Sequence, residues 1–373
     1  MHPARSSSRR EWAALAILLL CGAAVSYASD RHLPAAGVAS PARPALEAQP
    51  PQIQPPPVSE LALPAYRQVP LTIPEKLRVL VVAPHPDDET LGAGGLIQRV
   101  LDRGGSVQVL FVTNGDGFRS AVLASARHRR VSQRDFLAYG RLRRREAIAA
   151  LQVLGSTSIG STFLGFPDDG IDNLWAANWS DAHPYRSPFT DSDRPPYNDS
   201  ARRGIEYSGV DLERVLGEAL RTSAPDWVVI PDPRDRHPDH CTTGGFVLAA
   251  LNELRHSAGA PFSRIAVLTY LVHYPEYPGS PLWQQVINGA GIGGSSAGHE
   301  SLSHTSWMHF DLSPAEIARK REALGRYRSQ MAVMDSVLAL FVRPQEVFGH
   351  LSGAQLSTLP REYATRWRPH RSR

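Results

Sequence analysis

Short apolar segments rich in β-branched residues alternate with helical segments between residues 77 and 272. The run at 77–83 (LRVLVVA) is almost entirely apolar, as expected for a strand that is buried on both faces. This alternation predicts an α/β fold: a Rossmann-like, mostly parallel sheet with helices on both faces and ligand chemistry at the carboxyl ends of the strands. Further strands are expected at 107–113, 161–164, 226–230 and 265–272, and helices at 89–101, 141–154, 210–222 and 243–256.

A proline- and alanine-rich segment precedes this region. Residues 34–74 hold 11 of the 31 prolines, and only two charged side chains lie within 33–59. Such a segment cannot bury enough apolar surface to offset its ordering entropy, so an extended, disordered linker is predicted. Ahead of the linker, three arginines precede an uncharged apolar run at 12–25 and a small-x-small triplet, the layout of a secretory signal peptide. The run is short for a membrane span, and the sequence leaves open whether it is cleaved or kept as an anchor.

Three parts are therefore predicted: a signal peptide or membrane anchor at 1–28, a disordered linker at 29–74, and one globular domain with a C-terminal extension at 75–373. Export predicts a location in the periplasm, or attachment to the outer face of the inner membrane with membrane contact through the N-terminal segment. Of the net charge of +4, the first segment contributes +2, three arginines less one glutamate, so the remainder is nearly balanced. We expect no nucleic-acid partner, because the nine arginines within 119–145 lack the motifs and aromatic side chains of such sites. Solvated helix faces, or a patch for acidic glycans, account for that arginine run.

Two short motifs carry the candidate metal chemistry. The motif PHPDDE, at 84–89, follows the first predicted strand, and RHPDH, at 236–240, follows the strand at 226–230. Each places histidine and carboxylate side chains in a proline-stiffened loop, and this mixture of ligands suits a first-row divalent metal. A single His-Pro-Asp could be a turn that caps a helix, but two copies at strand-to-helix junctions favour a metal site with hydrolytic chemistry.

The spacing within each motif allows a division of roles. Of the adjacent pair Asp87 and Asp88, one could bind the metal while the other stays free as a general base. His237 and His240 are three residues apart, so both could face one pocket if a helix begins there. They would supply a third ligand and a second acid or electrostatic group.

The two motifs together resemble the PIG-L/LmbE-like family of metal-dependent N-acetylglucosaminyl deacetylases. The resemblance covers about residues 77–272, and KREAL (320–324) and YRSQ (327–330) resemble a further family signature. It implies Zn²⁺, or another divalent transition metal, as cofactor. The implied metal ligands are His85, Asp88 and His240, with Asp87 as general base and His237 stabilising the oxyanion.

The same resemblance implies two substrate-binding residues. The loop GFPDDG (165–170) resembles a family loop whose aspartate binds sugar hydroxyls, which implies Asp168. Arg143 with Glu146 resembles an Arg-x-x-Glu pattern near the substrate. The expected activity is metal-assisted removal of acetyl from an N-acetylamino sugar in a glycolipid or envelope polysaccharide. Hydrolysis of a non-sugar amide at the same site, and a catalytically silent glycan-binding module, are the alternatives.

Other features carry less information. The aromatic-rich segment 172–209 is expected to form an ordered lid that stacks on sugar rings, or else a surface excursion. The glycines within 92–95 favour close helix packing over a phosphate loop. Cys241 is expected to be a small buried residue at the start of a helix. His273 is expected either to line the pocket or to have a structural role. The Gly/Ser-rich segment 289–298 is expected to be mobile.

Overall fold

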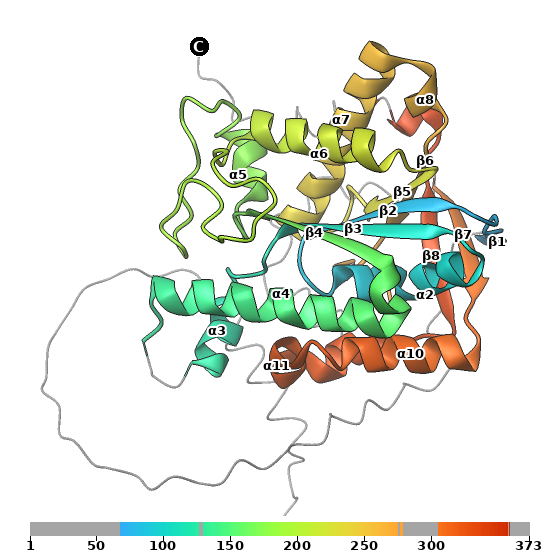
Figure 1. Ribbon diagram of the computed structural model, residues 1–373, viewed down its shortest axis with the longest axis horizontal. Coiled ribbons are helices and arrows are strands. Elements are labelled where there is room, and N and C mark those ends of the chain that lie inside the picture. The colour runs from blue at the N-terminus through green and yellow to red at the C-terminus, as the bar shows by residue number, and fades with distance from the viewer. Residues whose placement is uncertain (1–67, 127–129, 275–276, 279–304, 357, 359–373) are drawn as a thin grey trace, which may run out of the picture.

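The computed structural model describes residues 68–126, 130–274, 277–278, 305–356 and 358, which form an α/β domain around one sheet (Figure 1). Helices flank the sheet on both faces, as predicted. The strands are β1 (Gln68–Pro70), β2 (Arg78–Ala83), β3 (Ser106–Thr113), β4 (Ile159–Phe166), β5 (Trp227–Pro231), β6 (Ala266–Tyr270), β7 (Ser306–Asp311) and β8 (Gln345–His350). The α-helices are α2 (Asp88–Asp102), α3 (Arg119–Ser125), α4 (Gln133–Gly155), α5 (Ile171–Ala176), α6 (Gly209–Ser223), α7 (Pro238–Ala258), α8 (Ala260–Ser263), α10 (Pro314–Leu324) and α11 (Arg328–Leu338), with short 3₁₀ turns at Ser156–Ser158 and Ala339–Phe341.

Strand β2 lies beside β5 at the point where the strand order of the sheet reverses. Within the described residues the eight strands run β1-β7-β8-β6-β5-β2-β3-β4, and β8 is the strand that pairs antiparallel with both of its neighbours. The chain proceeds from β2 through β3 to β4 on one side, then returns to β5 and β6 on the other. Strand order therefore reverses between β2 and β5, and ligands of open α/β sheets bind outside the carboxyl ends of the strands at such a switch point.

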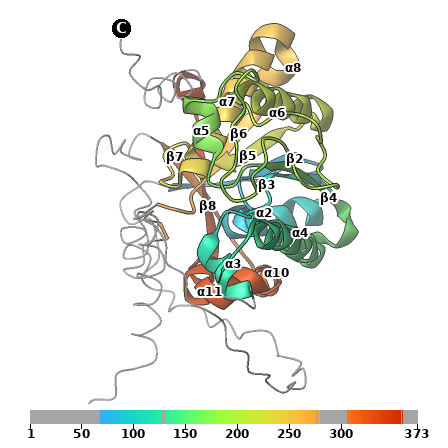
Figure 2. The same ribbon diagram turned by 90° about the vertical axis from the view of Figure 1, so that its left-hand side faces the viewer.

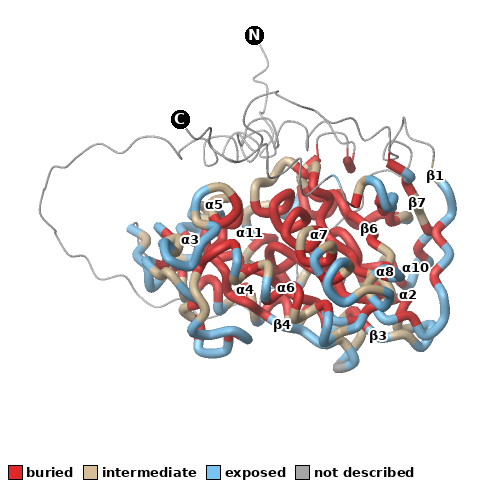
Figure 3. Tube along the Cα trace, turned by 90° about the horizontal axis from the view of Figure 1, so that it is seen from above, coloured by how far each residue is buried: buried red, intermediate tan, exposed pale blue. Residues whose placement is uncertain are grey.

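Two apolar cores lie on opposite faces of the sheet. Figure 2 shows the helices on both faces of the sheet, and Figure 3 marks the buried residues in red. Side chains alternate between the faces along a strand, so in β2 Val79 and Val81 enter one core while Leu80 and Val82 enter the other. Helices α2, α4, α10 and α11 cover the first face, and α5, α6 and α7 cover the second. Burial on both faces explains why the strand at 77–83 was recognisable as a continuous apolar run.

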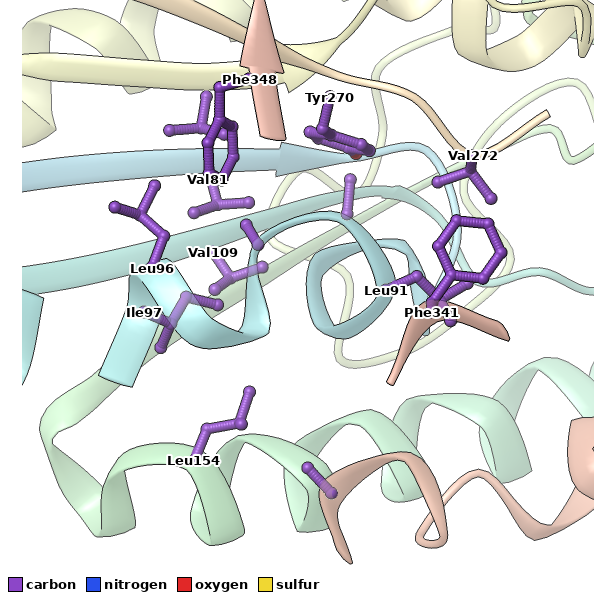
Figure 4. Close-up of a cluster of buried hydrophobic side chains, with 14 of the residues drawn as sticks. Val81, Leu91, Leu96, Ile97, Val109, Leu154, Tyr270, Val272, Phe341 and Phe348 are labelled. Atoms are coloured by element: carbon purple, nitrogen blue, oxygen red, sulfur yellow. The ribbon is translucent and has the colours of Figure 1, made fainter. Parts of the chain in front are cut away.

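Glycines in α2 allow this helix to pack tightly within the first core (Figure 4). A Cβ at Gly92 would lie 2.4 Å from the ring of Tyr270, and a Cβ at Gly95 would lie 2.7 Å from the side chain of Leu312. Neither position tolerates a side chain without movement of a core residue. The prediction that these glycines serve helix packing is confirmed, and the helix that contains them begins with the candidate ligand Asp88.

The structure corrects the predicted end of the linker. Residues 68–70 form β1, which pairs in parallel with β7, and Leu71 and Ile73 are buried in the first core. The folded domain thus starts inside the segment 29–74. This strand could not be predicted, because three residues that end in a proline carry no periodic pattern.

Part of the C-terminal third belongs to the domain itself, because β7 and β8 are strands of the central sheet, α10 packs against α2 and α4, and α11 packs against α3 and α4. The predicted signal segment, most of the linker and the segment 289–298 lie outside the described residues. Among the helices that the structure describes, none combines the length and the apolar character needed to cross a membrane.

Candidate active site

The two sequence motifs meet at the switch point. The loop after β2 leads into α2, the loop after β5 leads into α7, and the two strands are paired neighbours. The PHPDDE and RHPDH motifs, separated by about 150 residues in the chain, are therefore side by side. Helix α7 begins at Pro238, inside the second motif and five residues before the predicted start, with proline in the first turn where its missing N–H is not needed.

Three ligand atoms form a nearly equilateral triangle. His85 Nδ1 lies 3.2 Å from Asp88 Oδ2 and 3.2 Å from His240 Nε2, and the latter two atoms are also 3.2 Å apart. Donors about 2.1 Å from a tetrahedral zinc ion stand roughly 3.4 Å from one another, so the three atoms match one face of such a tetrahedron. All three side chains are buried. The residues predicted as ligands are thus brought together, and their donor set suits a zinc-type ion with a fourth position open.

Asp88 is ionised, as a ligand must be. Burial alone would raise the pKa of its carboxyl group, but the charge and hydrogen bond of His240 and those of His85 outweigh burial and hold this pKa well below its usual range. The backbone N–H of His85 also donates to Asp88 Oδ2 at 2.8 Å. The carboxylate is therefore held by groups of the same triangle.

Each histidine of the triangle has a buried carboxylate on its other ring nitrogen. His85 Nε2 lies 3.0 Å from Asp168 Oδ1, and His240 Nδ1 lies 3.6 Å from Asp235 Oδ2. Carboxylates in this position fix the orientation and tautomer of a metal-binding imidazole. In His85 the arrangement assigns the proton to Nε2 and leaves Nδ1 as the ligand atom.

The contacts of Asp168 are with protein groups. It was expected to bind sugar hydroxyls, but one of its oxygens contacts His85 and the other accepts a hydrogen bond from the backbone N–H of Gly117. The side chain is also buried. Its partners are protein groups, and it acts on the candidate metal ligand His85.

Sequence reasoning missed two further aspartates of the second loop. Asp235 accepts hydrogen bonds from the backbone N–H groups of His237, Val272 and His273. Asp239 accepts from the N–H groups of Asp169 and Ile171, and so ties the loop after β4 to the start of α7. Both side chains are buried. The available signal was their position: both lie within the DRHPDH sequence at the end of a buried strand.

Asp87 faces the same site from an unusual backbone conformation. Its φ is 121° and its ψ −28°, a region that residues with a side chain rarely adopt. Burial raises the pKa of the Asp87 carboxyl to about 7; Arg143 lowers this pKa, and the charges of Asp88 and Glu89 raise it. A buried carboxylate with a pKa near neutrality is suited to general-base chemistry.

Arg143, predicted to bind substrate, lies behind Asp87. From the middle of α4 its Nη2 donates to Asp87 Oδ2 at 3.0 Å and to the carbonyl of Pro86, and its Nη1 donates to the carbonyl of Gly115 at 3.1 Å. The side chain is 4% exposed. The guanidinium therefore holds Asp87 through Nη2, while its buried Nε donates to no protein group among the described residues.

Gly115 makes the approach of Arg143 to Asp87 possible. Its φ is +65°, and a Cβ there would lie only 2.0 Å from Arg143 Nη1. The Asn-Gly turn after β3 thus combines a left-handed backbone with the room that the guanidinium needs.

His237 is the N-cap of α7, and its Nδ1 accepts a hydrogen bond from the N–H of Asp239 at 3.2 Å. This contact assigns the ring proton to Nε2. Burial, followed by the neighbouring His273, His85 and His240, holds the pKa of His237 well below its usual range. The ring is neutral near pH 7, lies 5.0 Å from the ring of His85, and can donate a hydrogen bond from Nε2.

His273 belongs to the same histidine cluster. Its ring centroid lies 4.5 Å from that of His240, and its Nδ1 is 3.7 Å from Asp235 Oδ1. The structure therefore places it beside the second loop, behind the candidate ligand His240.

Three of the six aromatic rings in the segment 172–209 are buried. Trp175, Tyr197 and Tyr207 are buried, and the Tyr207 hydroxyl donates to the carbonyl of Gly165 at 2.7 Å. These three rings cannot stack on a sugar as predicted. Trp179, which is 40% exposed and stacked on Phe246, retains an open face.

Two further expectations have simple outcomes. Cys241 is buried in the first turn of α7, and its thiol donates to the carbonyl of Pro238, which confirms the expected buried position. Within the arginine-rich run, Arg143 is buried while Arg134, Arg141 and Arg145 are exposed on α4, in agreement with solvated helix faces.

Part of the chain is similar to known proteins. A family model described as PIG-L, GlcNAc-PI de-N-acetylase, matches residues 80–251. A 1D-myo-inositol 2-acetamido-2-deoxy-alpha-D-glucopyranoside deacetylase from Mycobacteroides abscessus is 32% identical over 186 residues, which cover 47% of this chain and 56% of that protein. The protein of the same name from Gordonia bronchialis is 30% identical over 179 residues, with coverages of 46% and 56%. The chain thus spans about half the length of the curated relatives it matches.

Among solved structures, N,N'-diacetylchitobiose deacetylase from Pyrococcus horikoshii aligns at 18% identity with a TM-score of 0.43, covering 74% of this chain and 84% of that one. The residues matched by the family model include both motif loops, α4 and the loop after β4. The predicted resemblance is confirmed over residues 80–251, which match the PIG-L family model.

Proposed function

We propose that the chain is a zinc-dependent hydrolase that removes the acetyl group from an N-acetylglucosamine-type sugar. The observation that carries the proposal is the triangle of His85, Asp88 and His240, with the base candidate Asp87 and the neutral donor His237 beside it. The names of the curated relatives, which are deacetylases of an acetamido sugar, support the substrate class.

The protein's own groups perform the proton transfers. A bound zinc ion would supply a Lewis acid that polarises the acetyl carbonyl and makes water more acidic. Asp87 takes a proton from the attacking water, whose oxygen forms the new bond to the carbonyl carbon. His237 donates from Nε2 to the carbonyl oxygen as negative charge develops there, a contact typically worth roughly 3–4 kcal/mol. Asp87 then returns the proton to the nitrogen as the C–N bond breaks, which releases acetate and the sugar amine.

The donor set supports zinc as the metal. Two imidazoles and one carboxylate with an open position are typical of catalytic zinc sites, and they also accept other divalent transition metals. Asp168 and Asp235 would hold the two imidazoles in place, because each contacts the ring nitrogen that does not face the triangle.

The cellular setting belongs to the same proposal. A basic, apolar N-terminal segment and a proline-rich linker support export to the periplasm or attachment to the outer face of the inner membrane. A glycolipid or envelope polysaccharide that carries N-acetylglucosamine would be the substrate within reach there.

The test is acetate release by the purified full chain from N-acetylglucosamine oligosaccharides, measured beside simple N-acetylated amides that are not sugars. We expect turnover on the sugars, and Asp87→Asn should lower kcat by about 10²- to 10⁴-fold with its metal content unchanged. Asp102→Asn, at the exposed end of the same helix, is the matched control and should behave as wild type. Turnover confined to non-sugar amides would contradict the substrate class, and an active Asp87→Asn would contradict the base.

A further inference from the structure

The segment 327–330 connects the C-terminal third of the chain to the site. It begins at Tyr327, between α10 and α11, and lies well beyond the residues matched by the family model. Tyr327, the N-cap of α11, and Gln330, in the first turn of this helix, are fully buried. Polar side chains at such depth require partners, and those partners lie around Asp87.

A chain of hydrogen bonds runs from Tyr327 to the backbone of Asp87. The Tyr327 hydroxyl donates to Glu89 Oε1, and the backbone N–H of Asp87 donates to Glu89 Oε2 at 3.1 Å. The Thr90 hydroxyl also donates to Glu89 Oε1. Glu89 has no exposed surface, so these donors are what compensates its buried carboxylate.

The backbone of Asp87 needs such a restraint. A residue with a side chain at φ 121° carries local strain of about 1–3 kcal/mol and keeps this conformation only when its surroundings dictate it. The carbonyl of Asp87 is held by the N–H groups of Thr90 and Leu91 at 3.0 and 2.9 Å, in the first turn of α2. Glu89 holds the N–H side, so the peptide groups on both sides of the Asp87 Cα are fixed.

The same segment also supports the group that holds the Asp87 carboxylate. Ser329 donates from its N–H and its hydroxyl to the two oxygens of Glu146, at 2.9 and 2.6 Å, and Gln330 Nε2 donates to the Tyr139 hydroxyl at 2.9 Å. Tyr139 and Glu146 lie on α4 four residues before and three residues after Arg143, on the same face of the helix. Backbone and carboxylate of Asp87 are therefore both braced by residues 327–330.

We propose that Tyr327 and Glu89 are positioning residues that set the orientation of Asp87 for proton transfer. This inference rests on the proposed function, in which Asp87 is the base. It predicts that loss of the Tyr327 hydroxyl affects the chemical step, whereas a residue with only a structural role would affect stability alone.

The decisive variant is Tyr327→Phe, which removes one oxygen and keeps the ring. We expect kcat to fall about tenfold, which corresponds to ~1.4 kcal/mol of barrier, with KM and metal content unchanged. Tyr270→Phe is the matched control, because its equally buried hydroxyl donates to the carbonyl of Val82 at 3.0 Å and lies outside the chain to Glu89. Tyr270→Phe should lower the free energy of unfolding by about as much as Tyr327→Phe does, but it should leave kcat unchanged. Equal kcat values for the two variants would overturn the proposal.

Glu89→Gln provides a second test through non-additivity. If Tyr327 acts only through Glu89, the double variant should be no slower than Glu89→Gln alone, and additive losses would contradict the chain of contacts. Amide hydrogen exchange of Asp87 is a readout that needs no substrate: it should be faster in Tyr327→Phe, while amides of β3 keep wild-type rates. A wild-type chain without acetate release refutes the proposed function, whereas unchanged exchange of the Asp87 amide refutes this inference.

Discussion

Replacing Gly115 by alanine should displace Arg143 from Asp87 without altering any charged residue. A Cβ at Gly115 would lie 2.0 Å from Arg143 Nη1 and 2.4 Å from Cζ, so the guanidinium has to move. Alanine at positive φ costs about 1 kcal/mol once the lower entropy of the unfolded chain is included. Separating the buried pair of Arg143 and Asp87 adds about 3–5 kcal/mol, because an uncompensated charge stays buried.

Gly104 offers a matched control for the backbone penalty. Its φ is +73°, and a Cβ there would meet nothing within 4 Å. Urea unfolding should therefore show a loss of about 1 kcal/mol for Gly104→Ala and of about 4–6 kcal/mol for Gly115→Ala. In acetate release, Gly104→Ala should match wild type, and Gly115→Ala should lose about 10²-fold in kcat through misplacement of the base. Equal losses in the two variants would refute the assigned role of Arg143.

Three further predictions concern single side chains around the site. Asp168→Asn should weaken zinc binding about 10- to 100-fold in competition with a chelator, because the carboxylate holds the His85 ring. If this variant instead kept wild-type zinc affinity but bound sugar more weakly, the result would support the predicted role of Asp168 in substrate binding. His237→Ala should lower kcat and kcat/KM together by about 10²- to 10³-fold in steady-state assays, whereas a change confined to KM would contradict its role as oxyanion donor. Burial, aided by the charge of Asp168, raises the pKa of Asp116 to about 7, so its protonated form stabilises the fold at low pH and this contribution is lost as the pH rises through about 7. Relative to Asp116→Asn, the free energy of unfolding of the wild type in urea should fall by up to about 1.4 kcal/mol per pH unit between about pH 5 and 7, with no further loss above pH 7. A difference between the two proteins that does not depend on pH would contradict the raised pKa of Asp116.

The central strands and the meeting of the two motifs could be predicted because both depend on local pattern and on topology. A strand buried on both faces, such as β2, appears as an apolar run, and the carboxyl ends of neighbouring parallel strands share one edge of the sheet. The candidate ligands followed from residue type and position on that edge. Helix α7 was placed five residues late because its first turn coincides with the RHPDH motif, which was interpreted as a loop.

The strands β1, β7 and β8 could not be predicted, because short segments of mixed polarity are specified by pairings between distant parts of the chain. The protein contacts of Arg143 and Asp168 could not be predicted for a related reason. A sequence pattern identifies a charged residue near the site, but only the fold shows that Arg143 faces Asp87 and that Asp168 faces His85. The contribution of Tyr327 is equally invisible in sequence, since its partner Glu89 lies 238 residues away.

Metal analysis combined with acetate release tests the central claim most directly. The purified full chain should bind about one zinc ion, release acetate from an N-acetylglucosamine oligosaccharide, lose this activity with a chelator and regain it when zinc is restored. The variant His240→Ala, which lacks one corner of the triangle, should lose both metal and activity. Acetate release by a chain that binds no metal and ignores the chelator would contradict the assignment of His85, Asp88 and His240 as a catalytic metal site.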